Sequence, residues 1–181
     1  MRTLITGGAG FQGSHMVEQC LLDGHEVAIL NTFSEEAKRV TDLFSGDVSV
    51  VWGSVTDPEI VKKTLRGQDV VIHLAARINV DESIGAPSSF LYTNLTGTYN
   101  VLEGVREQEC RLIYSSTCEV YGSVGSTPAG EESALRPHSP YAASKGAADL
   151  LCSAYRTTYD IDVTILRPCN IFGPRQKSGS G

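Results

Sequence analysis

Thr3-Leu4-Ile5-Thr6-Gly7-Gly8-Ala9-Gly10-Phe11-Gln12-Gly13 is the stretch that decides the fold of this chain. Its first four residues form a short apolar run that ends in glycines, which predicts a buried strand followed by a tight turn. The glycines at positions 7, 10 and 13 have the spacing G-x-x-G-x-x-G, and a helical pattern follows them. Such glycines permit the turn, let backbone approach a pyrophosphate and let the helix pack close to the sheet. The stretch therefore predicts a dinucleotide-binding turn, and the alternative is a glycine-rich turn without a ligand.

Apolar strands and helices alternate outward from this stretch along the whole chain. We expect strands at 3–6, 26–30, 48–52, 69–74, 111–115 and 162–166, and helices at 11–23, from 34, from 57, at 88–108 and at 139–159. Short apolar strands that alternate with helices favour a parallel sheet covered on both faces. Right-handed connections then give an α/β doubly wound sheet, the Rossmann arrangement. A surface loop is expected over 123–134, and a mobile tail over 176–181.

The composition limits the classes of molecule that the chain is expected to bind. The chain has 181 residues, enough for one domain, and a formal charge of −6 without a Lys/Arg cluster. We therefore expect no nucleic-acid partner and no membrane surface, and no apolar run approaches the length of a membrane span. The cysteines are dispersed and form no C-x-x-C pair: Cys20, Cys110, Cys118, Cys152 and Cys169. This usage predicts reduced thiols in a cytoplasmic protein without a bound metal.

The end of the second predicted strand bears on the choice of dinucleotide. Asn31 stands there, eighteen residues after Gly13, where an acidic residue usually binds the ribose 2′-OH of NAD. A neutral amide can hydrogen-bond a ribose, although it would not repel a 2′-phosphate. No arginine follows directly, since Lys38 and Arg39 lie farther along the chain. The pattern favours NAD over NADP, and the alternative is that Asn31 merely ends the strand.

A second informative stretch is Ser115-Ser116-Thr117-Cys118-Glu119-Val120-Tyr121-Gly122. It offers a hydroxyl, a thiol and a carboxylate at positions 117–119, three groups that can move protons. Tyr141 and Lys145 follow, four residues apart and therefore on one face of a predicted helix. A cation beside a phenol favours the phenolate, so we expect Lys145 to lower the pKa of Tyr141 from about 10 toward neutral. The pair then predicts a tyrosine that acts as a general base.

These motifs resemble the extended short-chain dehydrogenase/reductase family, in its NAD-dependent nucleotide-sugar epimerase/dehydratase branch. The matching pieces, in the family's order and spacing, are TGGAGFQG (6–13), HLAA (73–76), INVDESI (78–84), TNLTGT (93–98), SSTCEVYG (115–122), SPYAASK (139–145) and RPCNIFGPRQ (167–176). The resemblance covers nearly the entire chain. It implies NAD as the cofactor and a nucleotide-activated hexose as the substrate.

The resemblance also implies which residues contact the cofactor. They follow several of the predicted strands: Gly7, Gly10, Phe11, Gln12, Gly13, Asn31, Ser54, Val55, Leu74, Ala75, Ala76, Ser115, Tyr141, Lys145 and Pro168. Gln12 departs from the family's usual Ile or Leu, a change that leaves a backbone contact intact. Ser54 stands where the family usually has Asp, so the family's contact to the adenine amine is not carried over.

For catalysis the resemblance implies Tyr141 as the base, Lys145 as a cation on the ribose and Thr117 as a partner of the sugar hydroxyl. Ser83 and Asn170 are implied contacts to the substrate. Plainer alternatives remain for three of these residues, because Thr117 can be a strand end, Ser83 a helix cap and Asn170 a loop residue. The histidines, His73 among them, are assigned to packing and not to catalysis.

Glu119 favours a 4,6-dehydratase over a 4-epimerase. Both reactions are expected to begin with oxidation at the sugar C4, but a dehydratase must also remove the C5 proton and expel the C6 hydroxyl. Glu119 suits the first task, and Cys118 stands where dTDP-glucose 4,6-dehydratases have an Asp acid. A thiol is protonated at neutral pH and so can give a proton. Open alternatives are a UDP-glucose-type 4-epimerase, Cys118 as a buried small hydrophobe, and a non-catalytic NAD-binding domain.

The family is also informative about size and assembly. Its members usually carry a smaller C-terminal domain that grips the nucleotide base, so we expect most of that substrate domain to be absent here. The chain is then expected to consist of an NAD-binding domain at 1–175 and a tail at 176–181. The family further implies a homodimer built by helices 88–108 and 139–159. Small side chains would permit close helix approach, namely Ala142, Ala143, Ala147 and Ala148.

Overall fold

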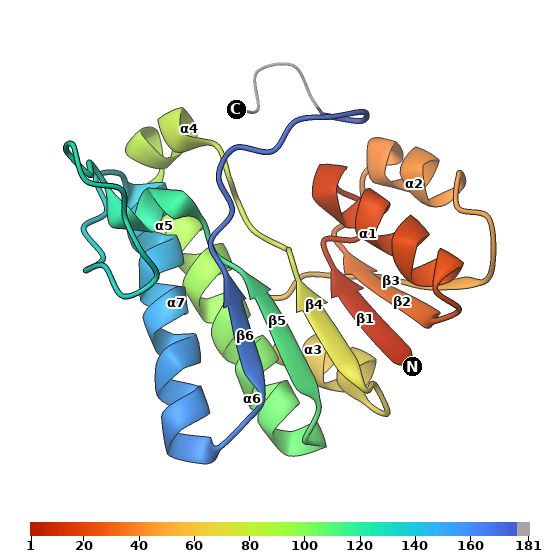
Figure 1. Ribbon diagram of the computed structural model, residues 1–181. Coiled ribbons are helices and arrows are strands. Elements are labelled where there is room, and N and C mark those ends of the chain that lie inside the picture. The colour runs from red at the N-terminus through yellow and green to blue at the C-terminus, as the bar shows by residue number, and fades with distance from the viewer. Residues whose placement is uncertain (177–181) are drawn as a thin grey trace.

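A six-stranded parallel sheet forms the centre of the molecule, and the computed structural model describes residues 1–176 (Figure 1). Its strands are β1 (Arg2–Thr6), β2 (Glu26–Asn31), β3 (Val48–Trp52), β4 (Val70–His73), β5 (Arg111–Ser115) and β6 (Val163–Leu166). Their order across the sheet is β3-β2-β1-β4-β5-β6, and every neighbouring pair is parallel. The chain thus winds outward in both directions from β1, which confirms the predicted doubly wound arrangement.

Helices follow the strands along the chain. They are α1 (Phe11–Leu22), α2 (Glu35–Thr41), α3 (Pro58–Leu65), α4 (Val80–Gly85), α5 (Pro87–Phe90), the π-helix η1 (Leu91–Thr96), α6 (Gly97–Gln108), the 3-10 helix η2 (Cys118–Tyr121) and α7 (Pro140–Tyr159). Side-chain caps fix several of their starts. Ser34, Asp57 and Ser139 each accept a hydrogen bond from a backbone N–H in the first turn of α2, α3 and α7.

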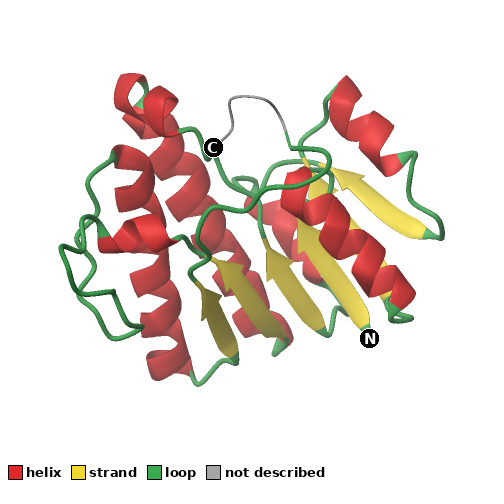
Figure 2. Cartoon of the chain, turned by 45° about the horizontal axis from the view of Figure 1, so that its top comes forward, coloured by secondary structure: helices red, strands yellow, loops and turns green. Residues whose placement is uncertain are grey.

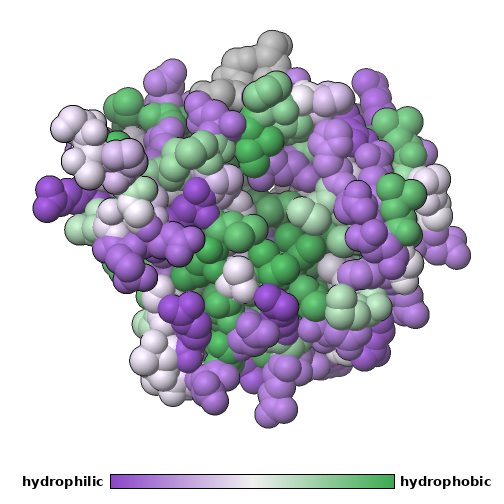
Figure 3. Space-filling view, viewed as in Figure 1, coloured by the Kyte–Doolittle hydropathy of each residue, from purple (hydrophilic) through white to green (hydrophobic). Residues whose placement is uncertain are grey.

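Two apolar layers hold the sheet, one on each face. Helices α3, α6 and α7 cover one face, where the core is centred on fully buried Leu102, Leu112 and Tyr114 (Figures 1 and 2). On the other face α1 packs over β1 and β2, where Val17 meets Ile5. Apolar side chains are exposed together on this second face, over the middle strands (Figure 3). The second face is therefore the less covered of the two.

The region from 78 to 108 departs from the sequence prediction. A single helix was expected over 88–108, but the structure has α5, the π-helix η1 and α6 in succession, preceded by the short helix α4. A π turn closes its hydrogen bonds one residue later than an α turn, and hydrophobic periodicity does not display that difference. Helix α4 is too short to show a period, although Asn79 caps it by accepting from the Glu82 N–H at 2.9 Å.

The expected loop over 123–134 is confirmed, because it has no helix or strand and is largely exposed. The predicted tail, apart from Gln176, lies outside the described residues. Within residues 1–176, each helix is too short or too polar to cross a bilayer. In that same part of the chain, no three His, Cys, Asp or Glu side chains gather in a way that could hold a metal ion.

Candidate functional site

The strand order reverses between β1 and β4, and the glycine turn lies at the carboxyl end of β1 beside that point. Open parallel sheets bind ligands in the crevice at such a reversal. The turn is packed tightly against its surroundings. A Cβ on Gly13 would lie 2.1 Å from the Gly7 oxygen, and a Cβ on Gly7 would lie 2.9 Å from the Ala75 nitrogen. Gly7 also has a φ of 73°, which favours glycine.

The first turn of α1 fits an anionic group. Gly10 precedes α1 in an extended conformation without a side-chain cap, and the first turn of α1 contains no acidic residue. Backbone N–H groups at a helix start that no side chain caps are suited to phosphate, and the helix dipole adds to the attraction. The turn therefore fits the pyrophosphate of a dinucleotide, with Phe11 and Gln12 contributing backbone.

Asn31 lies at the end of β2, as predicted from the sequence, but its side chain hydrogen-bonds the backbone of the protein itself. Its Oδ1 accepts from the Ala9 N–H at 3.2 Å, so it holds the glycine turn in place, and its Nδ2 donates to the Thr32 oxygen at 2.8 Å. Ser54 closes a local turn, because its Oγ accepts from the Thr56 N–H at 3.1 Å. Val55 is buried with its side chain against Gly97, and its carbonyl accepts from the Asn100 Nδ2 at 2.9 Å.

The run from 117 to 122 forms a compact turn after β5. Thr117 is buried and extended, and its Oγ1 accepts from the Glu119 N–H at 3.2 Å to start η2. Gly122 ends η2 with a φ of 66°, and a Cβ there would lie 2.0 Å from the Arg136 oxygen. The end of the 123–138 loop packs against this glycine, and there the Arg136 N–H also donates a hydrogen bond to Val120 O at 2.8 Å. Cys118 and Glu119 are left half-buried at the carboxyl end of the sheet.

Tyr141 meets this turn from the first turn of α7. Thr117, Glu119 and Cys118 all act on the pKa of its hydroxyl, so the structure brings these four predicted residues together. The expected direction of the Tyr141 pKa is wrong. Burial raises the pKa of Tyr141, and it outweighs the hydrogen bond from Thr117, which lowers it. Lys145 is not among the groups that shift it.

Lys145 faces the sheet from the next turn of α7. It is buried, its Nζ donates to the Ser115 oxygen at 2.6 Å, and it lies 4.4 Å from the centre of the Tyr114 ring. Burial lowers the pKa of Lys145 to about 8, while the Asp149 charge acts in the opposite direction. The ammonium is thus held by a carbonyl and an aromatic ring, which explains why it does not act on the Tyr141 phenol. Ser116 Oγ, next to this carbonyl, is buried without a partner in the described residues.

A buried polar network fixes the start of α7 to the crevice. Asn94, in the π-helix, accepts from the Arg77 N–H at 2.8 Å and donates to the Ser144 Oγ at 2.9 Å. Ser144 in turn donates to the Tyr141 oxygen at 2.7 Å. The π turn therefore has a position in the site, because its amide ties the segment after β4 to the helix that carries Tyr141 and Lys145. The motif TNLTGT was recognised in the sequence, but no role was predicted for Asn94.

His73 extends this network toward the glycine turn. Its Nδ1 accepts from Thr6 Oγ1 at 2.6 Å, and its Nε2 donates to Thr98 Oγ1 at 3.0 Å. This direction follows because Thr98 gives its own proton to the Asn94 oxygen at 2.6 Å, and Thr6 already accepts from the Ala75 N–H. Burial, and secondly the Lys145 charge, lower the pKa of His73 to about 3. It is a neutral structural histidine, consistent with the packing role assigned from the sequence.

Residues 167–176, here called the strap, cross the carboxyl ends of the central strands from β6 to α1 (Figure 1). Arg167 anchors the first end, with two 2.8 Å bonds to the fully buried Asp149 and one of 2.7 Å to the Tyr121 hydroxyl. Arg175 anchors the other end through bonds of 2.7 and 2.6 Å to Glu18. The resemblance gave these anchors no role, and only the charges of the motif RPCNIFGPRQ could have signalled them.

The remaining predicted residues have mixed positions. Pro168 is half-buried and accepts from the Cys118 N–H at 3.0 Å, so the strap contacts the turn at 117–122. Asn170 is exposed on the strap, open to a ligand. Leu74, Ala75 and Ala76 are half-buried, and the backbone of Leu74 and Ala75 lies beside Gly7. Ser83 is fully buried, and its hydroxyl donates to the Val80 oxygen at 2.6 Å, within α4 and not at its cap.

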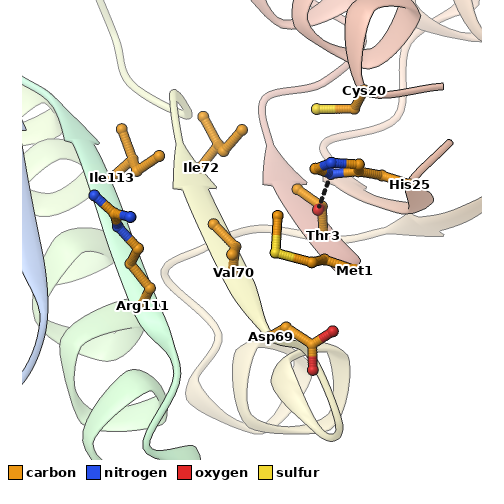
Figure 4. A pocket seen from close by; sticks show the side chains of 9 residues that line it. All are labelled: Met1, Thr3, Cys20, His25, Asp69, Val70, Ile72, Arg111 and Ile113. Atoms are coloured by element: carbon orange, nitrogen blue, oxygen red, sulfur yellow. Dashed lines mark hydrogen bonds between the residues drawn. The ribbon is translucent and has the colours of Figure 1, made fainter. Parts of the chain in front are cut away.

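A separate hollow of roughly 370 Å³ lies at the opposite edge of the sheet (Figure 4). Its lining comes from β1, β4 and β5, from α1 and from residues that precede β1, β2 and β4: Met1, Thr3, Cys20, His25, Asp69, Val70, Ile72, Arg111 and Ile113. Apart from Asp69 and Arg111 at one end, the walls are largely apolar, and Thr3 already hydrogen-bonds His25 at 3.0 Å. The hollow therefore belongs to the less covered face of the sheet and not to the crevice.

Comparison with known proteins places this site in a family. The profile of the "NAD dependent epimerase/dehydratase family" matches residues 3–181. The dTDP-glucose 4,6-dehydratase of Streptomyces niveus is 38% identical over 97% of this chain and 55% of that protein. The chain thus spans little more than half the length of this curated relative.

Solved structures agree with the fold in detail. DesIV, a dTDP-glucose 4,6-dehydratase from Streptomyces venezuelae solved with NAD bound, matches with 40% identity and a TM-score of 0.89, over 97% of this chain and 58% of that one. The UDP-glucose 4-epimerase of Thermus thermophilus in complex with NAD matches with 37% identity and a TM-score of 0.88, over 98% and 58%. Both activities therefore occur on this fold at similar identity, and both structures hold NAD.

Proposed function

The chain belongs to the NAD dependent epimerase/dehydratase family, and from that premise we propose that it acts as an NAD-dependent nucleotide-sugar 4,6-dehydratase. The observation that supports the choice is the surroundings of the Tyr141 hydroxyl. Thr117, the Glu119 carboxyl and the Cys118 thiol all act on its pKa, so the three groups lie around this hydroxyl. A 4-epimerase needs only one proton-transfer group at C4, whereas this turn presents a second base and an acid within the same site.

The residues of the chain then divide the proton transfers among them. The glycine turn, Asn31 and Lys145 would hold NAD, which would supply hydride transfer from and to the sugar. Tyr141 takes the proton of the sugar C4 hydroxyl, which Thr117 orients. Glu119 takes the C5 proton, which the resulting 4-keto group acidifies.

Cys118 completes the elimination. It gives its proton to the C6 hydroxyl, which leaves as water. Burial, together with the contact to Cys169, raises the pKa of the Cys118 thiol, so this group keeps its proton at neutral pH. An aspartate in its place would need a large upward pKa shift to do the same.

The test uses the full-length enzyme with NAD and four sugar nucleotides: dTDP-glucose, UDP-glucose, UDP-N-acetylglucosamine and GDP-mannose. The product is followed by NMR in D2O. A dehydratase introduces deuterium at C5 and loses the C6 hydroxyl. Inversion at C4 without deuterium at C5 would instead establish the 4-epimerase. The UDP-glucose 4-epimerase of Thermus thermophilus supports this alternative, because its identity to this chain is similar to that of the dehydratases.

A pair of variants isolates the carboxylate. Glu119→Gln should lower dehydration by about 10²–10⁴-fold, because it removes a general base, while NAD binding stays unchanged. Glu132→Gln is the matched control, since Glu132 is exposed on the 123–134 loop. Equal turnover in both variants would remove Glu119 from the mechanism.

We also propose that the chain forms a homodimer through the helical face that η1, α6 and α7 share. Large side chains are exposed there that a second copy would cover: Leu91, Tyr92, Tyr99, Leu150 and Tyr159. Sedimentation velocity should show twice the chain mass for the wild type and a monomer for Leu150→Glu. A wild type that sediments as a monomer at micromolar concentration would contradict the proposal.

A further inference from the structure

The end of β5 and the beginning of the strap continue the pairing of the sheet beyond its last regular residues. In the register of β5 and β6, Leu112 pairs with Val163 and Ser115 with Leu166. The ladder goes on, because Ser116 N–H donates to Leu166 O at 2.7 Å and Cys118 N–H to Pro168 O at 3.0 Å. Three residues beyond the last regular pair, this register sets Cys118 opposite Cys169.

Opposed residues on neighbouring parallel strands meet the geometric needs of a disulfide. Such strands lie about 4.8 Å apart, and the bond from the Cys118 N–H to Pro168 O keeps the first residue of η2 at that spacing from the strap. Disulfides join Cα atoms at about 4.4–6.8 Å. The two thiols also interact, because burial, and secondly the neighbouring Cys169 thiol, raise the pKa of Cys118.

The other cysteines lack this arrangement. Cys20, Cys110 and Cys152 are buried on α1, before β5 and on α7. Cys169 is exposed and Cys118 half-buried, so this pair combines an accessible thiol with a sheltered neighbour. That combination is typical of cysteines that respond to oxidants.

We propose that Cys118 and Cys169 are an oxidisable thiol pair, which a peroxide converts into an intrachain disulfide that closes the site. The Cys169 sulfur, as the thiolate, attacks one peroxide oxygen, the O–O bond breaks, and the sulfur becomes a sulfenic acid while the other oxygen leaves as water after protonation. The Cys118 sulfur then attacks the Cys169 sulfur, the S–O bond breaks, and the hydroxyl leaves with a proton as a second water. Two thiols are oxidised by two electrons, and one peroxide is reduced to two waters.

The bond would have two consequences in the site. Cys118 would lose the proton that it gives to the leaving hydroxyl, a consequence that rests on the proposed function. The strap would also be tied to the turn after β5 one residue before Asn170, between its anchors at Arg167 and Arg175. Oxidation would therefore stop turnover without unfolding the sheet.

The experiment treats the reduced whole chain with hydrogen peroxide, blocks the remaining thiols with iodoacetamide and maps the peptides by mass spectrometry. We expect the thiols that can be titrated after denaturation to fall from five to three, with one cross-linked peptide pair that contains 118 and 169. Dithiothreitol should restore all of them. Cys169→Ser should abolish the cross-link, and Cys20→Ala, the matched control, should keep it.

Two results would overturn the proposal. One is Cys169 oxidised to sulfinic acid, or cross-linked between two chains, while Cys118 stays reduced. The other is a complete 118–169 cross-link with unchanged turnover, because the expected loss is about 10²-fold or more. If the reduced protein turns over no sugar nucleotide, that result would contradict the proposed dehydratase but not the oxidisable thiol pair. Peptide mapping detects the disulfide whether or not the protein is active.

Discussion

The glycine turn and the candidate catalytic cluster around Tyr141 lie at the same edge of the sheet, yet they are built in opposite ways. The turn consists of consecutive residues and offers backbone N–H groups, so its shape depends on glycines that nothing larger can replace. The cluster consists of side chains from η2, α7 and the strap, which are far apart in the sequence. The first site is thus sensitive to one added methyl group, and the second to the contacts that hold separate segments together.

The largest effect is expected from a methyl group in the turn. In Gly13→Ala the new Cβ would lie 2.1 Å from the Gly7 oxygen and 2.7 Å from the Gly8 Cα, both backbone atoms that cannot move alone. We expect a loss of about 3 kcal/mol or more in the free energy of unfolding, together with weaker NAD binding. Urea denaturation and NAD titration measure both. Gly130→Ala, with no atom within 4 Å of its new Cβ, should stay within about 0.5 kcal/mol of the wild type.

A slightly smaller effect is expected where the strap is anchored. Asp149→Ala removes the buried partner of Arg167 and leaves a guanidinium whose side chain is 20% exposed. Breaking such a pair should cost about 2–4 kcal/mol in urea denaturation. Asp162→Ala breaks the exposed pair with Arg111 at 3.6 Å and should cost less than about 1 kcal/mol. Equal losses in the two variants would mean that the strap anchor contributes no more than a surface ion pair.

The network between the two regions predicts a pH dependence. The folded pKa of His73 is lowered to about 3, against about 6.5 in an unfolded chain. The unfolded state therefore binds the proton first, and the stability contribution is present above pH ~6.5 and lost as the pH falls toward ~3. The slope from this group should reach about 1.4 kcal/mol per pH unit within that window.

Urea denaturation between pH ~4.5 and ~7 checks this slope. His73→Gln should lack that part of it, whatever its stability at neutral pH. Thr98→Val, which keeps the imidazole but removes its acceptor, should be less stable and keep the slope. A wild type and a His73→Gln variant with parallel curves would contradict a buried neutral histidine.

The smallest effect is expected at the start of α7. Ser139 Oγ accepts from the Ala142 N–H at 3.1 Å, whereas α1 begins without a side-chain cap. Ser139→Ala should cost about 1 kcal/mol of stability and leave NAD affinity unchanged, because the capped N–H groups of α7 are not those offered to phosphate. A tenfold loss of NAD affinity in this variant would show that the two helix starts act on the same ligand.

Much of this molecule follows from local signals. The spacing of Gly7, Gly10 and Gly13 next to an apolar run predicted the strand, the turn and the helix correctly, since each depends on neighbouring residues only. The four-residue spacing of Tyr141 and Lys145 likewise predicted their common helix. The direction of the Tyr141 pKa shift could not be predicted in this way, because that pKa depends on the burial of Tyr141 and the Lys145 ammonium is held by Ser115 and Tyr114.

The sequence by itself determined the order of the six strands, the glycine turn and the residue types of the candidate chemistry, because periodicity, turn chemistry and motif spacing are properties of neighbouring residues. Only the tertiary structure decided that Asn94 ties the π-helix to α7, that the strap is anchored at Asp149 and Glu18, and that Cys118 lies opposite Cys169. These contacts join residues from separate strands and helices. Their partners are set by the register of β5 with β6 and by which groups burial leaves in need of a hydrogen bond.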